Sequence, residues 1–279
     1  MGSEMCIRDR VDYDPTVPEY HYDPSSYEAR VYQGFGHGDY DALLKLGPNI
    51  KDWPEIAPLG DNLLLKVASY ITDPVTTTDE LIPSGETSSY RSNPLGLAEF
   101  ALSRKDPAYV GRAKEVQKAQ KAVEADTCPG DALPEIHPVM DTIRATFSDV
   151  NRSNVGFGST IFAVKPGDGS AREQAASCQK VLGGWANIAN EYATKRYRSN
   201  LINWGMIPFV IDQGELPFHN LDYLFVPKIR EAIADGKTEF EAYVVKDGAL
   251  KPFTLRMGEL TPDEKDIILK GCLINYYRG

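Results

Sequence analysis

Long apolar runs and a basic surface are both missing from this chain. No run approaches the roughly 20 apolar residues that a helix needs to cross a bilayer, and the first residues carry charges where a signal peptide has an apolar centre. The 30 Lys and Arg are outnumbered by 40 Asp and Glu, which gives a net charge of −10. Because nucleic acid phosphates require a basic surface, this balance argues against such a partner. We therefore expect a cytoplasmic protein that binds neither membranes nor nucleic acid.

Cysteine is scarce as well. The four cysteines are scattered along the 279 residues and contain no C-x-x-C pair: Cys6, Cys128, Cys178 and Cys272. This spacing indicates neither a disulfide framework nor a zinc site, and we predict reduced thiols and no metal bound by this chain. A hydrophobic content of 42% with 25% charged residues is ordinary for a globular protein, so the chain is long enough for one large domain or two.

The most informative segment is the glycine turn, which we define as residues 167–174 with the sequence Gly-Asp-Gly-Ser-Ala-Arg-Glu-Gln. It follows a predicted strand over 159–164 and precedes a predicted helix over 175–182. Ser170 and Glu173 have capping-box spacing, which favours a purely structural helix cap. The same helix start would also present free N–H groups to a small anion, and Arg172 would add a charged contact. Local spacing leaves both interpretations open.

A longer pattern resembles the C-terminal swivel domain of the aconitase family. The first block of matching residues comprises Gly-Ser-Ala-Arg-Glu-Gln-Ala at 169–175, Leu-Gly-Gly at 182–184, Tyr-Arg-Ser-Asn-Leu at 197–201, Gly205 and Ile-Pro at 207–208. The second comprises Leu-Leu-Leu-Lys-Val at 63–67, Thr-Thr-Asp-Glu at 77–80, Pro83, Gly85 and Tyr-Arg at 90–91. The resemblance implies an α/β fold, namely the swivelling β/β/α three-layer domain. A bacterial aconitase-like hydratase is the branch that it resembles most.

This resemblance implies a hydro-lyase that eliminates water from a hydroxy di- or tricarboxylic acid and adds it back. Ser170 matches the serine base of the family, and Arg91, Gly169, Ala171 and Arg172 match positions that bind the substrate carboxylates. Ala171 departs from the pattern, because the family has a second serine there; the backbone amide is kept and the hydroxyl is lost. An alignment shifted by one residue would instead remove the base. Asp79 and Glu80 are expected to orient the loop that leads to Arg91.

The family also carries a [4Fe–4S] cluster on three cysteines in domains upstream of the swivel domain, and no cysteines of this chain match them. We therefore expect a fragment that is inactive alone and needs cluster-bearing domains, supplied by the same polypeptide or by a large subunit. Two alternatives stay open. Besides such a fragment, the chain could be a separately encoded small subunit of an isopropylmalate isomerase-like enzyme or a non-catalytic anion-binding module.

Three segments are predicted along the chain. Residues 1–10 resemble translated adapter or cloning sequence, residues 11–58 are rich in Asp, Tyr, Pro and Gly and form an inter-domain connector with a short helix over 40–46, and residues 59–279 form the swivel domain. Strands are predicted over 62–71, 159–164, 185–189, 207–211, 238–245 and 252–257. Helices are predicted over 95–104, 108–125, 138–147, 175–182, 191–203, 227–234 and 261–277, the last of them opened by a Thr261–Glu264 capping box.

Overall fold

The computed structural model describes residues 16–29 and 36–278, which belong to two units, 1–45 and 46–279. The predicted artefact at 1–10 lies outside the described residues. In the first unit the described residues form one short helix, α2 (Ser25–Glu28), and the helix predicted over 40–46 is replaced by a turn at Tyr40 and Asp41. No helix among the described residues is long and apolar enough to cross a bilayer.

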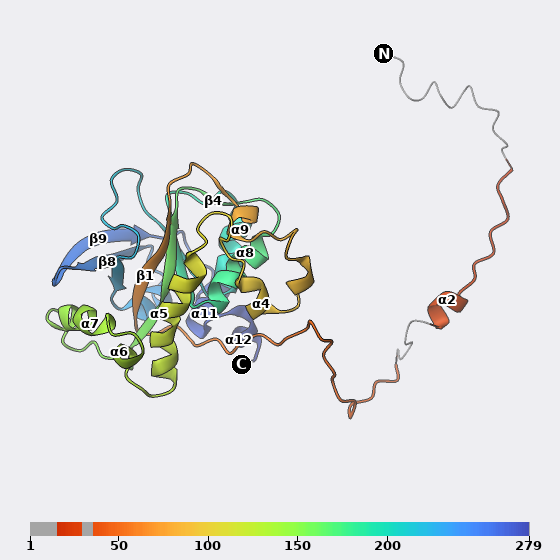
Figure 1. The fold of residues 1–279 in the computed structure, drawn as a ribbon, viewed down its shortest axis with the longest axis horizontal. Coiled ribbons are helices and arrows are strands. Elements are labelled where there is room, and N and C mark those ends of the chain that lie inside the picture. Colours follow the sequence, from red (N-terminus) through yellow and green to blue (C-terminus); the bar gives the residue numbers. More distant parts are fainter. Residues whose placement is uncertain (1–15, 30–35, 279) are drawn as a thin grey trace, which may run out of the picture. The chain divides into compact units, whose positions relative to one another are not determined.

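Seven strands of the second unit close into a barrel in the order β1-β3-β5-β6-β9-β8-β7 (Figure 1). Their bounds are β1 (Asn62–Ile71), β3 (Val155–Ala163), β5 (Gly184–Ala189), β6 (Ile207–Val210), β7 (Tyr223–Val226), β8 (Glu239–Lys246) and β9 (Ala249–Arg256). Strands β1, β3, β5 and β6 are parallel to one another. Strands β7, β8 and β9 run antiparallel to their neighbours. All residues of β3 and β5 are buried, as expected for parallel strands covered on both faces. The three-layer description stays a prediction.

Helices surround this barrel. They are α3 (Thr78–Leu81), α4 (Pro94–Ala98), α5 (Tyr109–Glu124), α6 (Pro129–Ala132), α7 (Ile136–Arg144), α8 (Arg172–Val181), α9 (Lys195–Asn203), α10 (Ile229–Ala234), α11 (Pro262–Lys270) and α12 (Leu273–Arg278), with the 3₁₀ turn η1 (Ser88–Tyr90). The predicted capping box of Thr261 and Glu264 opens α11 and is confirmed. The single helix predicted over 261–277 is wrong, because Gly271 adopts φ +95° and separates α11 from α12.

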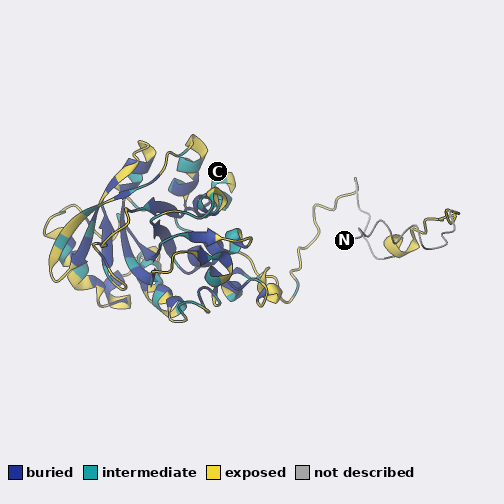
Figure 2. Cartoon of the chain, turned by 90° about the horizontal axis from the view of Figure 1, so that it is seen from above, coloured by how far each residue is buried: buried dark blue, intermediate teal, exposed yellow. Residues whose placement is uncertain are grey.

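The alternation of side chains along the strands builds three hydrophobic clusters. On β1, Leu63 and Leu65 enter a first cluster with strand residues of the barrel, whereas Leu64 faces a third cluster beneath α7. The second cluster lies under α4, α8 and α9 and contains Ala171 and Tyr197. Figure 2 shows buried residues concentrated along the strands at the centre of this unit, among them β1, β3 and β5, whereas β9 is largely exposed. The glycine turn is therefore attached to a packed core on the α8 side.

Residues 46–58 pack onto the rest of the second unit. The ring of Trp53 contacts that of Trp204 at an interplanar angle of 43° with centroids 4.4 Å apart, and the Lys51 N–H donates to the Ser92 carbonyl at 2.8 Å. The Ile56 carbonyl accepts a hydrogen bond of 2.8 Å from Asn275 Nδ2. This part of the predicted connector is thus anchored, while the division into connector and swivel domain stays a prediction.

Candidate functional site

The fold brings the two blocks that carry the family resemblance into direct contact. Strand β2 (Thr76–Thr77) pairs in parallel with β4 (Pro166–Asp168). Gly169 follows β4 with φ +134°, and a Cβ there would lie 2.2 Å from Thr78 Oγ1. Only glycine accepts this backbone conformation and this close approach. The threonine motif and the glycine turn are therefore parts of one structure.

Helix α9 is held over the glycine turn from the other side. Thr194 caps α9 by accepting from the Tyr197 N–H at 3.1 Å, and its hydroxyl donates to the Gly167 carbonyl at 3.3 Å. The buried Tyr197 ring packs directly on Gly167, because a Cβ added at Gly167 would lie only 2.3 Å from the nearest ring atoms. The Tyr197 hydroxyl accepts from Gln179 Nε2 at 3.0 Å and Asn187 Nδ2 at 2.8 Å, which fixes the ring. The helix predicted over 191–203 is present as α9 (Lys195–Asn203) and packs over the turn.

The capping box predicted for Ser170 and Glu173 is wrong. Helix α8 begins at Arg172, its N-cap is Ala171, and no side chain caps it. Gly169 sends the chain through a left-handed conformation, so the helix starts later than the spacing suggests. Glu173 instead accepts a hydrogen bond of 3.0 Å from Trp204 Nε1 at the end of α9. Ser170 is exposed, and no hydrogen bond joins its hydroxyl to any described residue.

The Ser170 side chain lines an open hollow between α8 and α9. The other lining residues are Arg172, Glu173, Lys195, Arg196, Ser199, Asn200 and Asn203. Within the described part of the chain, the three cations of this hollow have no ion pair, and the buried Arg172 Nε has no hydrogen-bond partner. The first N–H groups of α8 also lack intrahelical acceptors, as at any helix start. The hollow is therefore locally cationic in a protein of net charge −10.

The sequence predicts a helix over 191–203 but does not place Lys195 and Arg196 beside the glycine turn. Residues 195, 196, 199, 200 and 203 follow the i, i+4, i+8 spacing that places side chains on one side of a helix. That periodicity within the predicted helix over 191–203 is the signal in the sequence that these side chains share one face. Arg198 faces elsewhere, where its Nη2 donates to the carbonyls of Gly258 and Glu259.

Ala171 and Gly169 occupy different environments at the turn. Ala171 is 8% exposed and its methyl group belongs to the second hydrophobic cluster, so a serine hydroxyl at this position would point toward apolar side chains. Gly169 is exposed. Ala171 is the N-cap of α8, so its backbone amide lies at the helix start whether the side chain is alanine or serine. This amide can still donate a hydrogen bond.

Arg91 does not line the hollow. It ends the 3₁₀ turn η1 and is exposed, and the helix α4 that follows packs against α8. The loop before it is held by charged pairs. Asp79 pairs with Arg104, and Glu80 pairs with Lys105 at 3.2 Å while capping α3. Burial raises the pKa of Glu80, but hydrogen bonds from Thr77 and the Lys105 charge outweigh it and hold that pKa below its usual value.

The described cysteines do not fit an iron–sulfur cluster, which is held by thiolates. Cys178 and Cys272 are buried in the second hydrophobic cluster, and Cys128 belongs to a different part of the fold, beside α6. Burial, helped by the charge of Glu173, raises the pKa of the Cys178 thiol and so opposes the thiolate form. A cluster site on these residues is not supported.

A comparison with protein families matches the segment that contains the glycine turn. Residues 157–214, which run from β3 through the glycine turn, α8 and α9 to beyond β6, match the family described as Aconitase C-terminal domain. No curated protein matches the chain. Among solved structures, 3-isopropylmalate dehydratase from Methanocaldococcus jannaschii is 20% identical with a TM-score of 0.45, over 77% of this chain and 93% of that one. The match to residues 157–214 includes every residue of the first block of the resemblance and bears that resemblance out for this segment.

Proposed function

We propose that this chain supplies the carboxylate-binding hollow and the serine base of an aconitase-like hydro-lyase that acts on a hydroxy di- or tricarboxylic acid. One observation carries the proposal: the free Ser170 hydroxyl lines the same hollow as the three unpaired cations Arg172, Lys195 and Arg196. The helix start of α8 adds N–H donors to this hollow. A polycarboxylate has the charge and the multiple acceptors that match these donors.

The proposed role of Ser170 is to take a proton from the carbon next to a bound carboxylate. A serine hydroxyl acts as a base only if the negative charge on its oxygen is stabilised. The neighbouring cations and the N–H groups of the helix start provide that stabilisation, and the absence of a hydrogen-bond partner among the described residues leaves the hydroxyl free to face the substrate. Asn200 keeps one amide hydrogen for a further hydrogen bond to the carboxylates, because its other amide hydrogen and the Ser199 hydroxyl donate to the carbonyls of Arg196 and Lys195.

The leaving hydroxyl needs a group that this hollow does not offer. Glu173, the acidic side chain of the lining, is already hydrogen-bonded to Trp204. We therefore propose that a partner domain completes the site, on the same polypeptide or on a large subunit, and that it brings the iron–sulfur cluster of the family. The β/β/α swivel arrangement would allow the hollow to close onto that partner.

Binding can be tested on the chain itself. Trp204 contacts Glu173 at the edge of the hollow, so its fluorescence should change when citrate is added. Arg172→Gln and Lys195→Gln should each weaken citrate binding, because each removes a cation from the hollow. Lys251→Gln, an exposed change of the same charge on β9, is the control. Equal weakening by all three variants would show that only the net charge matters and would overturn the proposed site.

Catalysis is tested by reconstituting the chain with its cluster-bearing partner. Ser170→Ala should lower kcat by roughly 10²–10⁴-fold, the usual range for a lost general base, and leave the KM nearly unchanged. If turnover survives this substitution, the second candidate is favoured, a non-catalytic anion-binding module. The replacement of the second family serine by the buried Ala171 is the observation that supports that candidate.

A further inference from the structure

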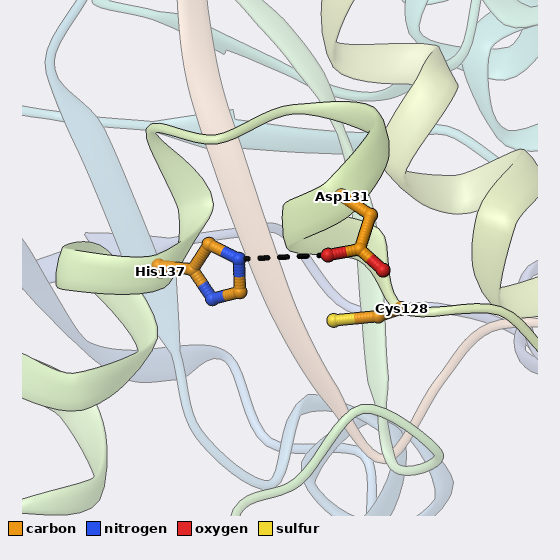
Figure 3. A group of neighbouring side chains, drawn as sticks. All are labelled: Cys128, Asp131 and His137. Atoms are coloured by element: carbon orange, nitrogen blue, oxygen red, sulfur yellow. Dashed lines mark ion pairs between the residues drawn. The ribbon is translucent and has the colours of Figure 1, made fainter.

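Three metal-binding side chains converge on the short stretch that contains α6. The ligand atoms of Cys128, Asp131 and His137 all lie within 4.8 Å of one another (Figure 3). His137 Nε2 is 4.0 Å from Asp131 Oδ1, and the Cys128 sulfur points toward the space between them. Cys128 is half-buried and the other two are exposed. This cluster lies outside the hollow between α8 and α9.

The backbone explains why these side chains meet. Cys128 is the extended N-cap of α6, and the Asp131 N–H donates to the Cys128 carbonyl at 3.1 Å. Beyond α6, the buried Ile136 starts α7 and fixes the position of the neighbouring His137. The imidazole lies directly over Gly130, where a Cβ would be 2.3 Å from Nε2. Glycine at position 130 is thus what lets the imidazole reach the other two ligands.

Two arginines line the same pocket, and their charges would oppose a cation if they were free. They are engaged elsewhere. Arg152 forms an ion pair with Asp126 at 3.0 Å, and Arg144 Nε donates to the Val150 carbonyl while its guanidinium lies 3.7 Å from Asp141. The thiol and the imidazole have no cationic partner among these contacts.

We propose that Cys128, Asp131 and His137 bind a zinc ion. A thiolate, an imidazole and a carboxylate are the ligands of tetrahedral Zn²⁺, whereas Ca²⁺ and Mg²⁺ require oxygen ligands. Zinc bonds of roughly 2.0–2.3 Å need the ligand atoms slightly closer than they lie here, which rotation of exposed side chains can provide. Three protein ligands leave a fourth position open to water or an exchangeable ligand. The spacing of cysteines alone predicted no zinc site, because this ligand set contains a single cysteine.

Isothermal titration of the full chain with zinc tests the site, in a Cys6→Ser background. One saturable site is expected. Cys128→Ser and His137→Ala should each weaken binding by more than about tenfold, since even loss of an outer partner of a ligand costs that much. His21→Ala, an exposed histidine in the first unit, is the control and should bind zinc as the parent does. Because thiol and imidazole must lose protons, the affinity should rise with pH.

Two further readouts separate ligation from nonspecific binding. Cobalt should give a thiolate-to-metal absorption band that Cys128→Ser abolishes, and zinc should slow alkylation of Cys128 by iodoacetamide until EDTA is added. Gly130→Ala should weaken zinc binding by displacing the imidazole while the circular dichroism stays unchanged. Failure of zinc to saturate one site, or full binding by Cys128→Ser, would overturn the proposal.

Discussion

At the scale of single residues, Gly169 links the two motif blocks. It adopts φ +134°, and its Cα approaches Thr78 so closely that a Cβ would be 2.2 Å from Oγ1. The residue also sets where α8 begins and thus leaves the Ser170 hydroxyl free. Its contribution is conformational, and no side chain can replace it.

We predict that Gly169→Ala lowers the free energy of unfolding by at least about 2 kcal/mol, from backbone strain together with the clash at Thr78. Citrate binding should be lost with it. Gly111→Ala is the matched control, because nothing lies within 4 Å of its Cβ inside α5, and it should stabilise the chain by about 0.5–1 kcal/mol. Urea unfolding of both variants measures this. A neutral Gly169→Ala would contradict the role assigned to the turn.

Lys180 is a second residue with an unusual environment. It is 5% exposed, its Nζ has no hydrogen-bond partner among the described residues, and it lies 3.6 Å from the centroid of the Trp185 ring. Burial lowers the pKa of Lys180 to about 7, and the influence of Cys272 offsets this only in part. The folded protein therefore opposes protonation at this position.

This depressed pKa predicts a stability that rises with pH. An unfolded lysine has a pKa near 10.4, so between about pH 7 and 10 the unfolded chain binds one more proton than the folded chain. Below about pH 7 both states are protonated, and the full cost of burying the charge is present. Lys180→Met should be more stable than the parent by a few kcal/mol at pH 7, and the difference should shrink toward pH 9. Urea unfolding at both pH values tests this, and a constant difference would refute it.

At the scale of elements, two capping boxes of the same type have different neighbours. Thr77 and Glu80 open α3 beside the glycine turn, and Thr261 and Glu264 open α11. Strand β2, which ends at Thr77, pairs with β4 immediately before Gly169. Loss of the first box therefore loosens the segment that positions Gly169, whereas the second box reaches the site only through Glu264, which lies 3.8 Å from Arg198 of α9.

Thr77→Ala and Thr261→Ala should each lower the free energy of unfolding by about 1 kcal/mol, the usual cost of a lost N-cap. Thr77→Ala should in addition weaken citrate binding, because the segment that positions Gly169 loses its anchor. Thr261→Ala should bind citrate as the parent does. Comparing urea unfolding with fluorescence titrations for the pair separates a local effect from general destabilisation, and equal binding by both variants would speak against the coupling.

Much of the element pattern could be predicted from the sequence. β1 and α5 have a clear pattern of apolar residues and are bounded by residues that end helices and strands. Their bounds agree with prediction to within a residue. β7 (Tyr223–Val226) was missed because four apolar residues carry no periodicity. The Ser170 capping box was mispredicted because spacing cannot reveal the left-handed φ of Gly169. Lys195 and Arg196 could not be predicted as site residues, because their place in the hollow depends on the packing of α9 on α8. That packing depends on contacts between residues distant in sequence.

At the scale of the whole molecule, the second unit begins before the barrel. Residues 46–58 contribute the contact of the Trp53 and Trp204 rings and the packing of Ile56 against the second hydrophobic cluster. The chain has a net charge of −10, whereas the hollow between α8 and α9 is lined by three cations. An anionic substrate would therefore be attracted to that hollow.

Truncation locates the boundary of the folded domain. A chain of residues 46–279 should unfold at the same urea concentration as the full chain, because it keeps these contacts. A chain of residues 59–279 should be less stable by about 2–4 kcal/mol, since it loses the contact of the exposed Trp53 ring with the buried Trp204 ring and the apolar packing of the half-buried Ile56. Equal stability of the two truncated chains would support the boundary at residue 59 instead.

The parallel pairing of β1 with β3 also determines when the site can form. Gly169 can approach Thr78 only after two strand pairings between distant parts of the chain have formed. In these pairings Asn62 lies opposite Val155 and Thr76 lies opposite Pro166. Closing such long loops is slow, because their entropy is lost before the contacts are gained. The hollow should therefore appear late in refolding. A bound polycarboxylate should then slow the unfolding reaction and leave the early collapse of the chain unaffected.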